Sequence, residues 1–144
     1  MQLTLFSDLS LRVLMYLASR KDPLQATVTV RGAASILDVP YTHMVKVVHQ
    51  LGSQGFMATT RGNGGGVRLA KLPEQIRVGE VLRKTEREKA VVDCAKPACP
   101  LQNKCLLKSA LDRAQAAFFG EMDRYTLADV AVAPALQALV SLSA

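Results

Sequence analysis

Residues 29–71 decide the fold, and they read TVRGAASILDVP (29–40), YTHMVKVVHQLGS (41–53) and QGFMATTRGNGGGVRLAK (54–71). Thr29 is a preferred helix N-cap and precedes an apolar-periodic run, so the first segment predicts a short helix. The sequence Asp38-Val39-Pro40 predicts a tight turn, because the residue before a proline is disfavoured in helical geometry. The second segment then predicts a helix from about Tyr41 to Ser53.

The third segment predicts a two-stranded hairpin. Gly55 ends the preceding helix, and residues 56–61 and 67–70 read as the two strands. Residues 62–66 join them with four glycines and one asparagine, a turn that requires positive φ at several positions. A short helix, a tight turn, an amphipathic helix and a glycine-tipped hairpin are, in this order, typical of a DNA-reading domain. The predicted fold class is mainly α with a small β-hairpin, a winged helix-turn-helix joined to a long dimerisation helix.

The helix at 41–53 separates into an apolar stripe and a polar face that contains no acidic residue. A solvated face of an ordinary amphipathic helix is the plain alternative, but the order of elements around it favours contact with bases and phosphates. The hairpin turn adds a guanidinium that suits the negative potential of a minor groove. The candidate DNA-binding residues are Tyr41, Thr42, His43, Lys46, Gln50, Arg61 and Asn63. The glycine cluster lacks the Lys-Ser/Thr ending of a nucleotide-binding P-loop, so ATP binding is not expected.

The remaining helices surround this unit. A first helix is expected from Ser7 or Asp8, as its cap, to about Ser19, and a fourth from Val78 to Lys84. Residues 86–104, which we call the cysteine loop, are expected to be irregular. A long helix at about 104–124 then carries one apolar seam in steps of three and four, formed by Leu107, Leu111, Ala114, Phe118, Met122 and Tyr125. Short helices are expected at 127–130 and 134–142. The chain is thus predicted to divide into a winged domain (1–85), the cysteine loop (86–104), and the dimerisation and C-terminal helices (105–144).

Charge is distributed unevenly along the chain. The net charge is +6; residues 1–72 carry eight lysines and arginines against three acids, whereas residues 73–144 carry ten against nine. A basic N-terminal half favours a polyanionic partner. No apolar run approaches the roughly 20 residues of a membrane span, and no secretion signal precedes the first helix, so a cytoplasmic protein without a membrane partner is expected.

The three cysteines of the chain, Cys94, Cys99 and Cys105, fall within twelve residues. An odd number of thiols in a reducing compartment argues against a disulfide framework. Thiolates are soft ligands that suit iron–sulfur clusters or zinc, but the paired knuckles of structural zinc sites are absent. Spacing alone leaves an iron–sulfur cluster and bare or zinc-binding thiols equally open. Three thiolates are also one short of the usual four cluster ligands.

No arrangement of nucleophile, base and acid at useful spacing is present, so we do not expect an enzyme. Two alternatives to a DNA-binding protein that carries an iron–sulfur cluster stay open. One is a thiol- or zinc-based redox regulator on the same DNA-binding fold. The other, which leaves the polar helix face and Arg61 unexplained, is an iron–sulfur electron carrier that does not bind DNA.

Taken together, the chain resembles the Rrf-type winged-helix transcription regulators that carry iron–sulfur clusters. The resemblance runs nearly from end to end, and Arg61–Leu69 is its most specific part. The matching segments are Leu3-Thr4, Asp8–Leu14, His43–Val48, Gln50-Leu51, Gly55-Phe56, Arg61–Leu69, the cysteine pattern and Tyr125–Asp129. Within the family the chain looks most like the repressors that respond to nitric oxide.

The resemblance implies a homodimeric repressor that binds a pseudo-palindromic operator in double-stranded DNA and releases it when nitric oxide damages the cluster. It implies that Cys94, Cys99 and Cys105 hold a 4Fe–4S cluster, with 2Fe–2S as the second possibility. The fourth ligand in that subgroup is an acidic residue from the first helix of the other subunit, which corresponds to Asp8. A sister group uses a histidine at the position of Lys108, so that ligation is not open to this chain. Because Asp8 and Arg12 are four residues apart, we expect Asp8 to switch between iron and an ion pair with Arg12.

Overall fold

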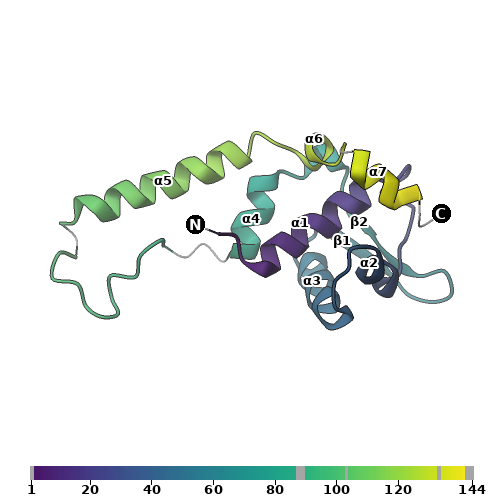
Figure 1. Ribbon diagram of the computed structural model, residues 1–144, viewed down its shortest axis with the longest axis horizontal. Coiled ribbons are helices and arrows are strands. Elements are labelled where there is room, and N and C mark those ends of the chain that lie inside the picture. Colours follow the sequence, from purple (N-terminus) through teal and green to yellow (C-terminus); the bar gives the residue numbers. More distant parts are fainter. Residues whose placement is uncertain (1, 87–89, 103, 133, 142–144) are drawn as a thin grey trace.

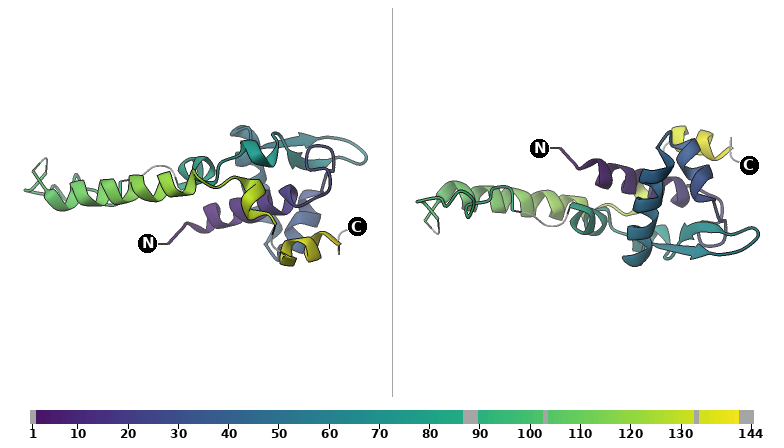
Figure 2. Two further views of the ribbon diagram at one scale, coloured as in Figure 1. Left: turned by 90° about the horizontal axis from the view of Figure 1, so that it is seen from above. Right: turned by 90° about the horizontal axis from the view of Figure 1, so that it is seen from below.

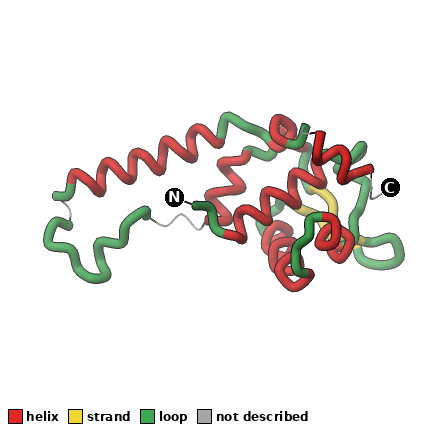
Figure 3. Tube along the Cα trace, in the orientation of Figure 1, coloured by secondary structure: helices red, strands yellow, loops and turns green. Residues whose placement is uncertain are grey.

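The computed structural model describes residues 2–86, 90–102, 104–132 and 134–141. A mostly helical body carries one antiparallel hairpin, as predicted, and a long helix projects from it with the cysteine loop at its far end (Figure 1). The strands occupy one small region in an otherwise helical chain (Figure 3). The elements are α1 (Leu5–Ala18), α2 (Val30–Ile36), α3 (Tyr41–Ser53), β1 (Met57–Thr60), β2 (Gly66–Leu69), η1 (Pro73–Gln75), α4 (Val78–Glu86), α5 (Leu106–Met122), α6 (Leu127–Val130) and α7 (Pro134–Ser141).

Helix α1 runs through the centre of the body and begins earlier than the sequence predicts. Its N-cap is Thr4, whose hydroxyl oxygen accepts a hydrogen bond from the backbone N–H of Ser7 at 3.2 Å. The expectation of a cap at Ser7 or Asp8 is therefore wrong. Ser7 is already helical and buried, and its hydroxyl bonds to α4 instead. The apolar stripe expected on this helix is confirmed, because its members Leu9, Val13, Tyr16 and Leu17 are all buried.

The helix-turn-helix forms as the sequence predicts. Thr29 caps α2 by accepting a hydrogen bond from the Gly32 N–H at 2.9 Å. Asp38 adopts a positive φ of 51° in the turn, and α3 has the predicted bounds. The buried residues of α3 are the predicted stripe Met44, Val47, Val48 and Leu51.

The hairpin pairs Met57 with Leu69 and Thr60 with Gly66. Its strands differ by about a residue from the predicted ones. Phe56 precedes β1 and closes the C-terminal end of α3, where its N–H donates to the Leu51 carbonyl at 3.0 Å. Val28 joins the hairpin edge through two backbone hydrogen bonds with Val67, of 2.8 and 2.9 Å. Any side chain at Gly66 would place its Cβ 2.5 Å from the Val28 carbonyl oxygen, so this approach requires glycine.

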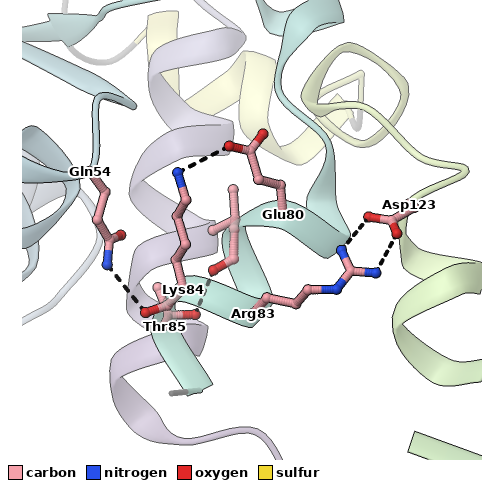
Figure 4. A network of polar contacts seen from close by, with 7 residues as sticks. Gln54, Glu80, Arg83, Lys84, Thr85 and Asp123 are labelled. Atoms are coloured by element: carbon pink, nitrogen blue, oxygen red, sulfur yellow. Dashed lines mark hydrogen bonds and ion pairs between the residues drawn. The ribbon is translucent and has the colours of Figure 1, made fainter. Parts of the chain in front are cut away.

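Helix α5 leaves the body along α4, and the two share a small apolar cluster of Val78, Leu82 and Phe119. It begins two residues later than predicted because Cys105 is its N-cap, with Sγ accepting from the Lys108 N–H at 3.4 Å. It ends at Met122, so Tyr125 lies outside the helical seam. Figure 4 shows Arg83 of α4 reaching Asp123, the residue that follows α5, with two guanidinium nitrogens facing the two carboxylate oxygens.

After α5 the chain returns to the body. Thr126 and Asp129 form a reciprocal cap on α6, and Leu127 is fully buried in the main core beside α1 and α3. The division of the chain into three parts stays a prediction, to which the structure adds that the C-terminal part contributes to the core of the first. No helix among the described residues is long and apolar enough to cross a membrane.

Candidate nucleic-acid interface and cysteine site

The polar face of α3 lies open at the start of the helix. Tyr41, Thr42, His43 and Lys46 are all exposed, and the first turn contains no acidic residue. The right-hand view of Figure 2, taken from below, looks onto α2 and α3 without another element covering them. The structure therefore brings together four of the predicted DNA-binding residues on one accessible surface, which we call the α3 face.

Gln50 lies elsewhere. It is half-buried and lines a cavity of about 830 Å³ between α1, α4 and α5, where its neighbours include Phe6, Leu11 and Phe118. Gln50 is therefore not part of the exposed α3 face, although it belongs to the same helix.

The two predicted hairpin residues, Arg61 and Asn63, are exposed in the loop between β1 and β2. Gly62 and Gly64 in this loop have φ of 100° and 78°, so the prediction of several positive φ angles is confirmed. Thr27 fixes the loop by donating its hydroxyl to the Gly64 carbonyl at 3.1 Å. The hairpin loop projects from the body at the end opposite to the cysteine loop (Figure 1).

A contact that the sequence pattern does not reveal joins α2 to α3. The guanidinium of Arg31 lies over the ring of Tyr41, 4.6 Å from the ring centroid, and both side chains are exposed. The only sequence signal for it is a basic residue in the acid-free first turn of α2. It adds a cation to the edge of the α3 face.

The three cysteines are free thiols and half-buried. Cys94 and Cys105 line one pocket of about 400 Å³ together with Lys104 and Lys108. The Cys99 N–H donates to the Cys94 carbonyl at 3.0 Å, which holds the first two cysteines in one turn. Among the residues that the structure describes, no three Cys, His, Asp or Glu side chains are gathered closely enough to hold a metal ion.

Lysine side chains make the surroundings of the thiols electropositive. The Lys108 ammonium donates to the Asp112 carboxylate at 2.6 Å, and this hydrogen bond raises the pKa of Lys108 above its ordinary 10.5, with Cys94 and Cys105 acting in the same direction. Cysteine sulfur is a soft donor of the kind that holds iron in iron–sulfur clusters. The donor chemistry of three reduced thiols beside a lysine thus fits an iron–sulfur cluster, and Lys108 itself is a cation rather than a fourth ligand.

Asp8 and Arg12 form the expected ion pair on the surface of α1. The two guanidinium–carboxylate distances are 2.9 Å (Nε to Oδ1) and 2.8 Å (Nη2 to Oδ2). The side chains retain 38% and 56% of their exposure, so Asp8 remains accessible to a group outside its own protomer. An exposed pair of this kind contributes at most about 1 kcal/mol and separates at low cost.

A polar network ties the start of α1 to the end of α4, the helix after which the cysteine loop begins. Glu86 accepts hydrogen bonds from the N–H of Thr4 at 2.8 Å and from its hydroxyl at 3.1 Å. The Ser7 hydroxyl donates to that of Thr85 at 2.8 Å in a buried position. On its other sides α4 bonds to Gln54, at the end of α3, and to Asp123, at the end of α5 (Figure 4). Helix α4 therefore links the C-terminal end of α3, the helix bearing Asp8 and the segment that follows the long helix.

A helix-turn-helix followed by a hairpin, with a cysteine loop on a projecting helix, defines a winged-helix protein of the regulator class. Residues 3–133 match the model of the Rrf2 family, which is described as an iron-dependent transcriptional regulator. The chain belongs to the Rrf2 family.

Curated relatives agree over nearly the whole chain. One from Shouchella clausii, the HTH-type transcriptional regulator NsrR, is 41% identical over 133 residues, which cover 90% of this chain and 88% of the relative. The HTH-type transcriptional repressor NsrR of Streptomyces coelicolor is 40% identical over 144 residues, covering 99% and 97%. These relatives are transcriptional regulators and not enzymes, in agreement with the expectation from the sequence.

Solved structures share the fold. IscR of T. potens superposes with a TM-score of 0.72 at 18% identity, covering 90% of this chain and 85% of its own. CymR, the global cysteine regulator of B. subtilis, superposes with a TM-score of 0.74 at 21% identity, covering 91% and 96%. At this identity the superpositions establish the winged-helix fold and nothing finer.

Proposed function

We propose that this Rrf2-family chain is a transcriptional repressor that binds double-stranded DNA as a homodimer, at a pseudo-palindromic operator. The observation that carries the proposal is the exposed, acid-free α3 face, together with the exposed Arg61 of the hairpin. A recognition helix contacts bases mainly through its N-terminal residues, which here are Tyr41, Thr42, His43 and Lys46. Arg61 and Asn63 suit the adjoining minor groove. The names of the curated relatives, regulators and repressors of the helix-turn-helix type, support the same function.

The seam of α5, which is exposed at its far end and half-buried near the body, supports the homodimer. Leu107 at the far end of the helix is 66% exposed, and the only buried side chain of α5 is Phe119, near its C-terminal end. An apolar stripe of this length on a projecting helix is typical of a helix that packs against a second copy of itself. Two such copies on a two-fold axis would place two α3 faces on successive major grooves.

We further propose that Cys94, Cys99 and Cys105 hold an iron–sulfur cluster, of the 4Fe–4S or 2Fe–2S type, through which the repressor responds to nitric oxide. The cluster supplies iron atoms with which nitric oxide reacts. The chain supplies the three thiolates, the lysines that offset their charge, and Asp8 as the ligand given to the partner subunit. Once released from iron, the Asp8 carboxylate accepts both hydrogen bonds from Arg12 of its own helix, the arrangement found here. Such a regulator acts where the DNA is, in the cytoplasm, and needs no membrane partner.

Selection from a randomised duplex library tests DNA binding. The anaerobically purified protein should enrich one inverted-repeat sequence, with half-sites about one helical turn apart, and its affinity for that duplex should fall steeply with salt. Enrichment of no sequence, or binding without salt dependence, would remove the proposed function and favour an electron carrier.

Iron and sulfide analysis of the same sample tests the cluster. About four irons and four sulfides per chain with a broad absorption near 400 nm would support 4Fe–4S, and two of each would support 2Fe–2S. The Cys99→Ser variant should lose both the iron and the absorption. A protein that contains zinc, or neither metal, while binding DNA would support the thiol- or zinc-based regulator.

A further inference from the structure

The side chain of Arg31, on α2, contacts Tyr41 of the α3 face described above. Its guanidinium is held over the Tyr41 ring at 4.6 Å from the centroid. Guanidinium groups stack well on aromatic rings, because the positive plane faces the negative ring face. The stacking fixes where the charge of Arg31 is presented, at the junction of the two helices.

The charge of Arg31 is not compensated by a carboxylate in the described part of the chain. Arg12 pairs with Asp8, Arg83 with Asp123 and Arg124 with Glu121. Arg31 has only the ring, which attracts its charge without neutralising it. A positioned but unpaired cation on an exposed surface is complementary to a fixed anion.

The contact with the ring leaves the donors of Arg31 available. A cation–π contact uses the charge of the guanidinium, and its five N–H groups remain able to donate. Two parallel N–H donors match the oxygens of one phosphate. Thr42 and His43, which follow Tyr41 on α3, are exposed and are themselves candidates for contact with DNA.

We propose that Arg31 binds a phosphate of the DNA backbone, and that Tyr41 is the positioning residue that holds the guanidinium in place through its ring. This inference rests on the proposed function. The inference also changes the role predicted for Tyr41. Its ring positions Arg31, and its hydroxyl need not contact a base. The inference further makes the contact independent of base sequence, because phosphate carries no sequence information.

The test compares Arg31→Gln, Tyr41→Phe, Tyr41→Leu and the double variant Arg31→Gln/Tyr41→Leu in the full-length protein. Each binds two probes over a salt series, the duplex obtained by selection and an unrelated duplex of equal length. Arg124→Gln is the matched control, since it removes the same charge from an exposed arginine in the segment between α5 and α6. Figure 1 shows this segment on the side of the body opposite to α2 and α3. Unfolding midpoints verify that every variant is folded.

Arg31→Gln should make the slope of log K against log salt shallower by about 0.9 for each protomer bound. Over a fourfold change in salt this corresponds to a difference of about 3.5-fold per protomer. The affinities for both probes should fall by the same factor, so their ratio stays constant. Tyr41→Phe, which keeps the ring, should retain the salt slope of the unsubstituted protein. Tyr41→Leu should weaken binding to both probes, and the double variant should lose little beyond Arg31→Gln alone.

Three results would overturn the inference while leaving the proposed function intact. They are an Arg31→Gln protein with the slope of the control, a change in the ratio of the two affinities, and losses in the double variant that add fully. If Tyr41→Phe makes the salt slope shallower, the hydroxyl of Tyr41 and not its ring is responsible. That result would also overturn the inference. Absence of binding by the unsubstituted protein would remove both the inference and the proposed function.

Discussion

Helices in the body of the protein and the far half of α5 both carry apolar side chains at helical spacing. In the body these side chains are buried, whereas at the far end of α5 they are exposed. In the body the apolar stripes of α1 and α3 are buried, with Leu14 and Leu51 at 0% exposure. At the far end of α5, Leu106 and Leu107 are 87% and 66% exposed. The winged domain therefore completes its core with its own chain, whereas the far end of α5 leaves apolar side chains exposed, as the proposed homodimer requires. The difference separates residues that hold the fold from residues that we propose to serve assembly.

Truncation of a core leucine should have the largest effect. Leu51→Ala is expected to lower the free energy of unfolding by about 2–5 kcal/mol, because it leaves a cavity among fully packed side chains. Leu106→Ala, the matched change at an exposed position, should alter it by less than about 0.5 kcal/mol. Urea denaturation measures both. Equal losses would contradict the comparison.

Charge on the seam should break assembly without unfolding the body. Leu107→Glu is expected to convert the dimer to monomers at micromolar concentration, since a carboxylate at an apolar interface loses its hydration without gaining a partner. Ala116→Glu on the opposite, exposed side of α5 is the control and should stay dimeric. Sedimentation velocity reads out both. A dimeric Leu107→Glu protein would place the interface elsewhere.

Substitutions of two predicted DNA-binding residues of α3 should differ in their effect on DNA binding. Lys46→Ala is expected to weaken operator binding by about 1–3 kcal/mol, because Lys46 is exposed on the α3 face. Gln50→Ala should cost less, since Gln50 lines the cavity against α1 and α5. Fluorescence anisotropy with the selected duplex compares the two variants. A larger loss for Gln50→Ala would show that this residue turns outward to DNA.

The ion pair between α4 and α5 should give a small, pH-dependent contribution. The hydrogen bond from Arg83 holds the pKa of Asp123 below its ordinary 3.8. A carboxyl whose pKa is lowered on folding stabilises the folded state above pH 3.8, and the contribution is lost as the pH falls through the lowered value. Because the pair is about one-third exposed, Asp123→Asn should cost at most about 1 kcal/mol near neutral pH.

Thermal melts of Asp123→Asn and the unsubstituted protein over a pH series check this contribution. Their difference should shrink below pH 3.8, and Arg83→Gln should show the same trend. A difference that is constant with pH would assign the loss to packing instead of charge.

The smallest effect is expected at Asp8 in metal-free protein. Asp8→Asn removes an exposed i, i+4 pair, so the free energy of unfolding should change by less than about 0.5 kcal/mol. In the cluster-loaded protein the same substitution should accelerate loss of the 400 nm absorption in air. Identical decay of the two proteins would exclude Asp8 as a ligand.

The helix-turn-helix and hairpin could be predicted closely because their signals are local: the Thr29 cap, the turn at Asp38, and glycines at positive φ. The start of α1 could not. Thr4, Ser7 and Asp8 are all capable caps, and the choice is accompanied by bonds to Thr85 and Glu86, some 80 residues away. The apolar seam of α5 could be predicted from the helical spacing of its residues. That spacing does not show which of the seam's side chains a single protomer leaves exposed.

At the candidate site, too, local features could be predicted from the sequence and contacts between distant segments could not. The α3 face follows from one amphipathic helix, whereas the stacking of Arg31 on Tyr41 and the position of Gln50 in a cavity depend on neighbouring helices that the sequence does not place.

The central claim is that DNA affinity depends on the state of the cysteine site. The direct measurement is the dissociation constant for the selected duplex, determined anaerobically before and after titration with nitric oxide, with Cys99→Ser protein in parallel. We predict a loss of affinity of at least tenfold in the unsubstituted protein, a coupling of about 1.4 kcal/mol. The Cys99→Ser protein should bind weakly from the start and not respond. Unchanged affinity after nitric oxide, in protein shown to carry iron and sulfide, would contradict the account.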